Sequence, residues 1–134
     1  MRKRERKEKQ CKHCSKLIPN MNTYCDNNCQ QLYQKEKYIK EWKSGLQKGY
    51  RSEKTYMLSR HVQSYLRDRC GNKCETCGWS QKNQYTNQVP LEIDHIDGDA
   101  SNCVEANLRM ICPNCHSLTP TFRNTGGRKS KRAR

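Results

Sequence analysis

The sequence predicts a small α+β fold that is held together by zinc. The chain has 134 residues, of which 32% are hydrophobic, and it contains a single Phe. A core this thin usually needs cross-links or metal ions to be stable. Ten cysteines are present, and most of them fall into close pairs with metal-ligand spacing. Short strand-like and helix-like segments surround these pairs, which favours a mixed fold over an all-helical one.

The cysteine pairs are expected to bind metal and not to form disulfides. The stretch MRKRERKEKQ runs into the first pair without an apolar segment, so it does not resemble a secretory signal. No stretch of about 20 apolar residues predicts a membrane span. We therefore expect a cytoplasmic protein, and in that compartment paired cysteines bind metal more often than they form disulfides.

Positive charge dominates the chain and indicates a polyanionic partner. There are 27 Lys and Arg against 13 Asp and Glu, a formal net charge of +14. Basic runs at both ends are commonly solvated tails, but neutralising phosphates also releases counterions and drives binding. Nucleic acid is favoured over a membrane surface, because no amphipathic segment carries bulky apolar anchors.

The first predicted zinc site follows the basic N-terminal run. Cys11 and Cys14 form one pair and Cys25 and Cys29 form another, in the pattern C-x2-C-x10-C-x3-C. Four thiolates from two close pairs can complete a tetrahedral shell around zinc. Asp26 is expected to cap a helix that begins directly after it.

The capped helix is predicted to continue through NNCQQLYQKEKYIKEWK. Leu32, Ile39 and Trp42 give it a narrow apolar seam. Its lysines are free to face outward, either as a solvated surface or toward DNA. These are Lys35, Lys37, Lys40 and Lys43.

A linker and a second helix are expected next. Residues 44–52 contain two glycines and predict the linker. Gly71 is a natural helix stop, and His61 is interpreted as a packed histidine and not as a ligand. The apolar stripe of this helix recurs at helical spacing and consists of Met57, Leu58, His61, Val62, Tyr65 and Leu66.

A second zinc site is predicted from two C-x2-C pairs that 34 residues separate. The pairs are Cys74 with Cys77 and Cys112 with Cys115. Either pair alone could be a redox motif, but together they are typical of two zinc knuckles around an insertion. His116 is an alternative to Cys115 as a zinc ligand. Cys70 and Cys103 belong to neither predicted site and are interpreted as small packing residues.

The insertion is acid-rich. Five acids and no Lys or Arg lie between Tyr85 and Asn107. QVPLEIDHI alternates in polarity and predicts a strand, DGD predicts a turn, and LRMI predicts a short second strand. Pro113 suits the first position of a short helix. The predicted order is strand, long loop, strand and helix.

Four side chains in this region could carry chemistry. Asp94 and His116 offer a carboxylate oxygen and an imidazole nitrogen, ligands that suit Mg²⁺, Mn²⁺ or Ni²⁺. An imidazole with a free pKa of about 6.5 can take a proton from water at neutral pH, so His95 is a candidate general base. The amide of Asn107 could hold either the loop or the imidazole. An adjacent Asp-His pair also occurs by chance, so the signal is the combination of these residues.

The segment LEIDHIDGDASNCVEANLRMICPNCHSLT resembles the HNH endonuclease family and its ββα-metal fold, and the resemblance covers residues 70–127. It implies a general base at His95, metal ligands at Asp94 and His116, and the motif asparagine at Asn107. The paired knuckle cysteines match the family's structural zinc site. Thr119 and Pro120 stand where some members carry another metal-binding His, so two protein ligands are expected.

The resemblance implies a metal-dependent endonuclease that hydrolyses phosphodiesters in double-stranded DNA, nicking it or cutting both strands, as phage-encoded nicking and homing enzymes do. Two structural zinc ions and a catalytic Mg²⁺ or Mn²⁺, with Ni²⁺ as a further option, are the expected cofactors. A monomer is favoured, in the host cytoplasm if a phage encodes it. The alternatives are a non-catalytic DNA-binding protein on an HNH scaffold and a thiol redox protein.

The expected layout divides the chain into four parts. Residues 1–44 hold the basic tail, zinc finger and basic helix, and 45–69 hold the linker and second helix. Residues 70–127 hold the nuclease domain, and 128–134 form a basic tail. Candidate DNA contacts are Lys35, Lys40, Arg109, Arg123 and Arg128.

Overall fold

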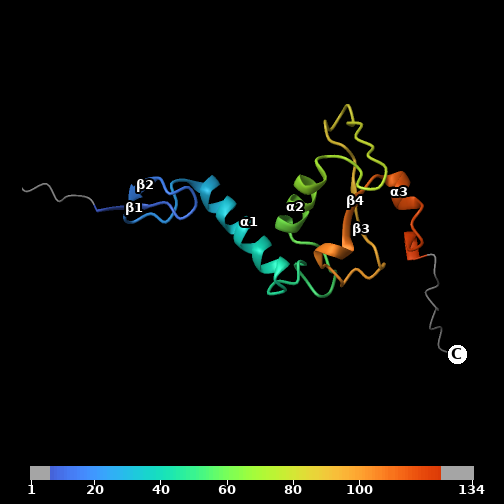
Figure 1. Cartoon of the computed structure of the whole chain (residues 1–134), viewed down its shortest axis with the longest axis horizontal. Helices are drawn as coiled ribbons and strands as arrows, with labels where there is room; N and C mark the ends of the chain where they lie inside the picture. Colours follow the sequence, from blue (N-terminus) through green and yellow to red (C-terminus); the bar gives the residue numbers. More distant parts are fainter. Residues whose placement is uncertain (1–6, 125–134) are drawn as a thin grey trace, which may run out of the picture.

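The computed structural model describes residues 7–124, which form two small antiparallel hairpins connected through helices (Figure 1). This confirms the predicted small α+β architecture. None of the helices in this range combines the length and apolar character needed to cross a membrane. Arg128 and the C-terminal tail lie outside the described residues. In chain order, the elements are β1 (Glu8–Gln10), β2 (Leu17–Pro19), α1 (Asn27–Lys43), α2 (Arg60–Cys70), β3 (Glu92–His95), β4 (Leu108–Ile111) and α3 (Pro113–Ser117), with 3₁₀ turns at Glu105–Asn107 and Phe122–Asn124.

The N-terminal unit consists of β1, β2 and the first turn of α1. Its small core contains Cys11, Ile18 and Cys29, all buried. The side chain of Asp26 accepts a hydrogen bond from the Cys29 backbone N–H at 2.7 Å and so caps α1, as predicted. Figure 1 shows this unit at one end of α1, with the remaining elements gathered at the other end.

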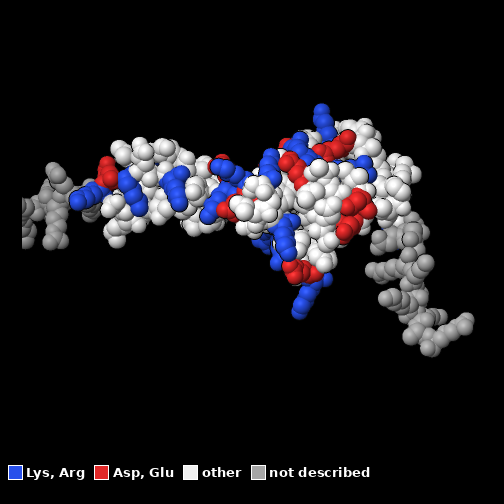
Figure 2. All heavy atoms as spheres, turned by 60° about the horizontal axis from the view of Figure 1, so that its bottom comes forward, with Lys and Arg blue, Asp and Glu red and all other residues white. Residues whose placement is uncertain are grey.

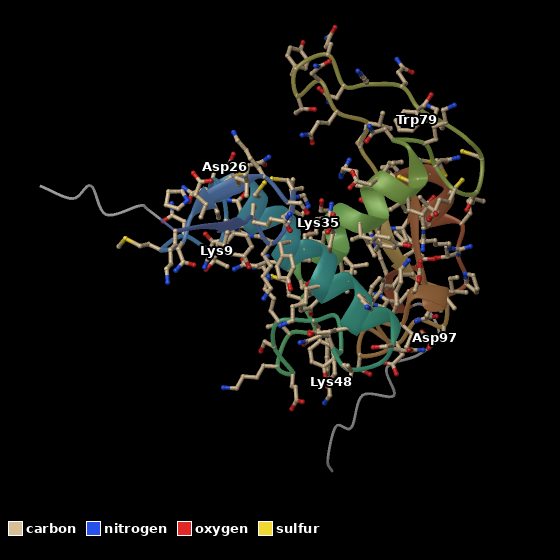
Figure 3. The ribbon with its side chains drawn as sticks, turned by 60° about the vertical axis from the view of Figure 1, so that its left-hand side comes forward. Lys9, Asp26, Lys35, Lys48, Trp79 and Asp97 are labelled. Atoms are coloured by element: carbon tan, nitrogen blue, oxygen red, sulfur yellow. The ribbon has the colours of Figure 1, made fainter. Side chains whose placement is uncertain are left out.

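Only the C-terminal half of α1 packs into the main core. Ile39 and Trp42 are buried there, but Leu32 is 39% exposed, so the predicted seam is shorter than expected. Lys35 is half-buried. Its Nζ donates to Asp68 Oδ2 and to Ser64 Oγ, each at 2.8 Å, because α2 crosses α1 at this point (Figure 3). Lys35 is therefore paired at the surface and less free than predicted.

Helix α2 begins later than the apolar stripe suggested. Ser59 caps it and accepts a hydrogen bond from the Val62 backbone N–H at 3.2 Å. Met57 precedes the cap and is 55% exposed, so it is not part of the helical stripe. The helix ends at Gly71, which adopts the left-handed conformation that glycine favours, with φ of 60°. His61 stacks on Tyr38 with ring centroids 5.3 Å apart, consistent with a packed histidine.

Residues 44–52 are held in place on both sides and do not form a free linker. Tyr50 pairs with Leu58 in an isolated β-bridge, and the Ser59 backbone N–H donates to the Gly49 carbonyl at 2.8 Å. Trp42 Nε1, at the end of α1, donates to the Cys103 carbonyl at 2.7 Å. This bond joins α1 to the loop between β3 and β4.

The main core lies between α2 and the β3–β4 hairpin. Strand β3 pairs with β4 so that Asp94 stands opposite Arg109 and His95 opposite Leu108. Helix α2 contacts β4, and α3 contacts β3. The core extends across the domain boundary predicted at residue 44, because Ile39 and Trp42 share one cluster with the hairpin. The most completely buried side chains are Val62, Leu66, Leu108, Met110 and Ile111.

Candidate active site

Two groups of four cysteines have the geometry of zinc sites. In each group the four sulfur atoms lie within 4.8 Å of one another, as a tetrahedral thiolate shell requires. His116 is not a member of either group, so the pairing of Cys112 with Cys115 is favoured over the alternative that used His116. The groups are Cys11, Cys14, Cys25 and Cys29, and Cys74, Cys77, Cys112 and Cys115.

In each group the local backbone favours the ionised form of one cysteine, whereas hydrogen bonds from neighbouring sulfurs raise the pKa of Cys29 and Cys115. Burial opposes ionisation of Cys74, but backbone hydrogen bonds at Cys112 and Cys77 outweigh it and lower the pKa of Cys74 to about 6. A backbone hydrogen bond at Cys14 is the main cause that lowers the pKa of Cys11 to about 6. Zinc binds the thiolate form of cysteine, so the chemistry of both groups fits that ion.

The second cysteine group is linked to the hairpin through Glu75, which follows Cys74. One carboxylate oxygen of Glu75 accepts from the Met110 backbone N–H at 2.5 Å. The same carboxylate accepts hydrogen bonds from Nε and from a terminal nitrogen of Arg69, at 3.0 and 2.9 Å. Arg69 also donates to the Leu108 carbonyl at 2.9 Å. An ion bound by the second cysteine group would therefore also hold β4 in place through Glu75.

The hairpin and α3 bring Asp94 and His116 together. The Nε2 atom of His116 lies 3.8 Å from Oδ1 of Asp94, and the second oxygen, Oδ2, accepts from Arg109 Nε at 2.7 Å. Asp94 is 4% exposed. It can be buried as a carboxylate because Arg109 compensates its charge.

Glu92 also belongs to this cluster and was missed in the sequence. Its Oε2 is hydrogen-bonded to Nδ1 of His116. Since a carboxylate accepts, Nδ1 carries the proton and Nε2 keeps a lone pair directed to Asp94. The available signal was the spacing, because residues two apart on a strand, as Glu92 and Asp94 are, share one face. One carboxylate oxygen and one imidazole nitrogen thus face a common point and fit a divalent cation whose remaining ligands are water.

His95 follows Asp94 at the end of β3 and lines a groove beside α2. No hydrogen bond or ion pair joins it to Asp94 or His116 within residues 7–124. Its Nε2 is 3.6 Å from the sulfur of Cys103, which is 2% exposed. Burial raises the pKa of the Cys103 thiol, and the charge of Asp99 adds to this effect, so the group stays protonated. Cys103 is therefore the buried neighbour of the candidate base.

Asn107 braces the loop between the strands. Its Nδ2 donates to Asp97 Oδ1 and to the Asn102 carbonyl, each at 2.8 Å. Its Oδ1 accepts from the Asp97 backbone N–H at 3.0 Å. Of the two predicted roles, holding the loop or the imidazole, these contacts support the first. In Figure 3, Asp97 lies far from Lys9 of the N-terminal unit.

The candidate DNA contacts differ in their surroundings. Lys40 is exposed on α1. Arg123 is exposed, and its guanidinium lies 5.1 Å from the centre of the Phe122 ring. Arg109 and Lys35 are each paired with a carboxylate, Asp94 and Asp68 respectively. The paired side chains support the fold directly, and contact of any of these residues with DNA stays a prediction.

The hairpin and the following helix form a small α+β domain with a four-cysteine group that could hold zinc. A candidate metal centre lies between β3 and α3. Residues 74–119 match the family model described as HNH endonuclease, so the chain carries an HNH endonuclease domain in this region. The H-N-H endonuclease F-TflIV of Escherichia phage T5 is 47% identical over 53 residues, which cover 37% of this chain and 21% of that relative. No solved structure matches the chain.

Proposed function

We propose that this chain is a metal-dependent DNA endonuclease that hydrolyses phosphodiester bonds. The observation that carries the proposal is the 3.8 Å approach of His116 Nε2 to Asp94 Oδ1, within the region that matches the HNH endonuclease family. The phage T5 relative is named an H-N-H endonuclease, and the matched segment spans about a fifth of its length. The activity of the whole chain is therefore inferred from its own residues.

Asp94 and His116 would hold a Mg²⁺ or Mn²⁺ ion, which neutralises charge on the phosphate and the departing oxygen when bound. Arg109 keeps Asp94 in place, and Glu92 orients the ring of His116 through Nδ1. The two protein ligands leave most of the shell to water and phosphate oxygens. A site of this kind exchanges its ion readily, unlike a closed four-thiolate site.

His95 is proposed as the general base. Its imidazole is half-buried on the wall of a groove beside α2, where water can reach it. The ring takes a proton from that water, and the resulting hydroxide attacks phosphorus. The bond from phosphorus to the 3′-oxygen breaks, and this oxygen takes a proton from solvent, which leaves 5′-phosphate and 3′-hydroxyl ends. Asn107 serves this step by fixing the loop that follows His95, through its bonds to Asp97 and Asn102.

The N-terminal four-cysteine unit and α1 are proposed to bind duplex DNA beside the nuclease domain. The exposed Lys40 and the net charge of +14 support this role. One active site per chain cuts one strand in each encounter, so nicked DNA is the expected first product.

A plasmid assay tests the proposal. Brief EDTA treatment should stop cleavage while both zinc sites keep their metal, and added Mg²⁺ or Mn²⁺ should restore nicking. Asp94→Asn should remove the response to added metal. Glu53→Gln is the control, because Glu53 is exposed and pairs with Lys48 ahead of α2.

Two outcomes would contradict the proposal. Cleavage at full rate in EDTA would show that Asp94 and His116 are not a divalent-metal site. Binding without cleavage under every metal condition would instead favour the non-catalytic DNA-binding alternative.

A further inference from the structure

A groove of about 730 Å³ runs between α2 and β3. His95 lies on its strand wall, with Ile93 and Leu91 beneath it. The helix wall presents Arg60 and Arg67, the latter half-buried. The groove therefore brings the candidate base and two arginines of α2 to one cavity.

The two arginines are spaced to follow a chain of phosphates. Residues seven apart on a helix lie on the same face, so Arg60 and Arg67 point to the same side. At about 1.5 Å per residue, they are separated by about 10 Å along the helix. Phosphates of one DNA strand follow each other every 3.4 Å or so along the duplex axis, so this spacing corresponds to about three phosphate steps. The positions between the arginines carry Gln63 and Ser64, which are polar and also line the groove.

Within residues 7–124, neither Arg60 nor Arg67 forms an ion pair with a carboxylate, whereas other arginines near the hairpin do. Arg69 is paired with Glu75, and Arg109 with Asp94. The one acid that lines the groove is Glu92, whose carboxylate is hydrogen-bonded to His116. Figure 2 shows basic side chains along much of the molecule, with most of the acidic ones toward its wider end. The charges on Arg60 and Arg67 are thus available to a ligand.

The rim of the groove carries a backbone feature that bulky residues rarely adopt. Tyr56 has φ of 49°, in the left-handed region. Its ring lies edge-on to Tyr50 with centroids 5.2 Å apart, and it lines the groove. Strained positions of this kind collect at binding surfaces, and Tyr56 lines the same groove as Arg60.

We propose that this groove binds the sugar-phosphate backbone of the strand to be cut, with Arg60 and Arg67 each on one phosphate. The phosphates they hold flank the scissile one, which then lies next to His95. The proposal rests on the proposed nuclease function and extends it by naming the residues that hold the substrate strand. These residues touch the substrate but move no proton.

The test is the salt dependence of binding to a short mixed-sequence DNA duplex, measured by fluorescence anisotropy without added Mg²⁺ or Mn²⁺. Each phosphate contact contributes a slope of about −0.9 to log affinity against log salt. Arg60→Gln and Arg67→Gln should each reduce the slope by about 0.9, and the double variant by about 1.8. Arg60→Lys keeps the charge and should keep the slope.

Lys73→Gln is the matched control, because Lys73 is exposed after the end of α2 and does not line the groove. It removes the same charge and should leave the slope near that of the parent chain. Far-ultraviolet circular dichroism on all variants excludes loss of fold. Equal slopes for the double variant and the parent chain would overturn the groove proposal.

The outcomes separate the groove from the nuclease proposal. A lower slope with the double variant supports the groove even if the parent chain never cleaves plasmid, in which case only the nuclease function fails. Metal-dependent cleavage with an unchanged slope leaves the nuclease function intact and removes the groove. In an active enzyme, the double variant should also lose efficiency at low substrate concentration more than at saturation.

Discussion

The Nε atom of Arg109 donates to Oδ2 of Asp94 at 2.7 Å, directly across the register of the β3–β4 hairpin. The carboxylate is 4% exposed, so its charge needs this partner. The bond also occupies one oxygen and leaves Oδ1 on the side of His116. Arg109 therefore acts on the candidate metal site through Asp94, whether or not it also contacts DNA.

Removal of this partner should weaken both the fold and the metal response. Arg109→Gln leaves a buried carboxylate with poorer compensation, which typically costs about 1–3 kcal/mol in the free energy of unfolding. Cleavage should then need a higher Mg²⁺ concentration, because Asp94 is no longer held in one orientation. Urea unfolding and a metal titration measure the two effects. Arg60 pairs with no carboxylate within residues 7–124, so Arg60→Gln should change stability by less than about 0.5 kcal/mol. Equal stability of the two variants would contradict the role of Arg109 as the partner of Asp94.

Substitution of the proposed base should separate catalysis from binding. His95→Ala should lower the cleavage rate by about 10²–10⁴-fold, the usual effect of losing a general base. DNA affinity should change little, because the imidazole acts on water. Single-turnover cleavage and anisotropy measure these quantities. His61→Ala is the control, since His61 stacks on Tyr38 away from the hairpin. Near-parent cleavage by His95→Ala would rule out His95 as the base.

Elemental analysis should find two zinc ions per folded chain, one in each cysteine group. Cys112→Ser should unfold the nuclease half, because structural zinc binding is coupled to folding and Cys112 also caps α3. Cys11→Ser should spare that half and weaken DNA binding, since Cys11 belongs to the separate small core with Ile18 and Cys29. A single zinc in the parent chain would remove the N-terminal part of this prediction.

The loop between the strands should lose stability in acid. A side-chain hydrogen bond from Asn102, with further bonds from Asp99 and Asn107, lowers the pKa of Asp97 below its usual value. A lowered folded pKa means that the ionised group stabilises the fold above the unfolded pKa of about 3.9. That contribution disappears as the pH falls through the lower folded pKa. Asp97→Asn should therefore unfold more easily at neutral pH and show a flatter acid limb, measured by urea midpoints across pH. Parallel pH profiles for the two proteins would argue against this role.

Gly49 permits the contact that joins α1 to the active-site loop. A Cβ atom there would lie 2.7 Å from Trp42 Nε1 and 3.2 Å from the Cys103 carbonyl oxygen. Gly49→Ala should therefore disturb the bond between Trp42 and Cys103 and destabilise the chain by about 1–3 kcal/mol. Gly45→Ala is the matched control, because Gly45 has a similar φ of 84° but nothing within 4 Å of an added Cβ. If both variants lose the same stability, backbone strain and not the contact is the cause.

Local features were predictable from the sequence because short-range chemistry determines them. The spacing of the cysteines anticipated both four-sulfur groups, and Asp26 and Gly71 marked helix ends that the structure confirms. The order of strand, loop, strand and helix also followed, because Pro113 and the alternation near Ile93 act over a few residues.

Features that depend on distant partners were not predictable. Lys35 was expected to face solvent, but its partner Asp68 lies 33 residues away on another helix. Asp94 was expected to bind metal and Arg109 to contact DNA, but the pairing of the two across neighbouring strands was not foreseen. Pattern analysis of one element at a time does not contain these pairings, since they arise only when elements pack.

The bond from Trp42 to Cys103 lets the length of α1 set a fixed distance between the four-cysteine unit and the loop between β3 and β4. The C-terminal end of this helix is fixed to the loop of the candidate active site, and its N-terminal end is capped by Asp26 within the four-cysteine unit. With 17 residues, α1 is about 25 Å long, which corresponds to about seven base-pair steps of a duplex at 3.4 Å each. If the N-terminal unit binds DNA, each cut would fall a constant number of base pairs from the site that this unit contacts.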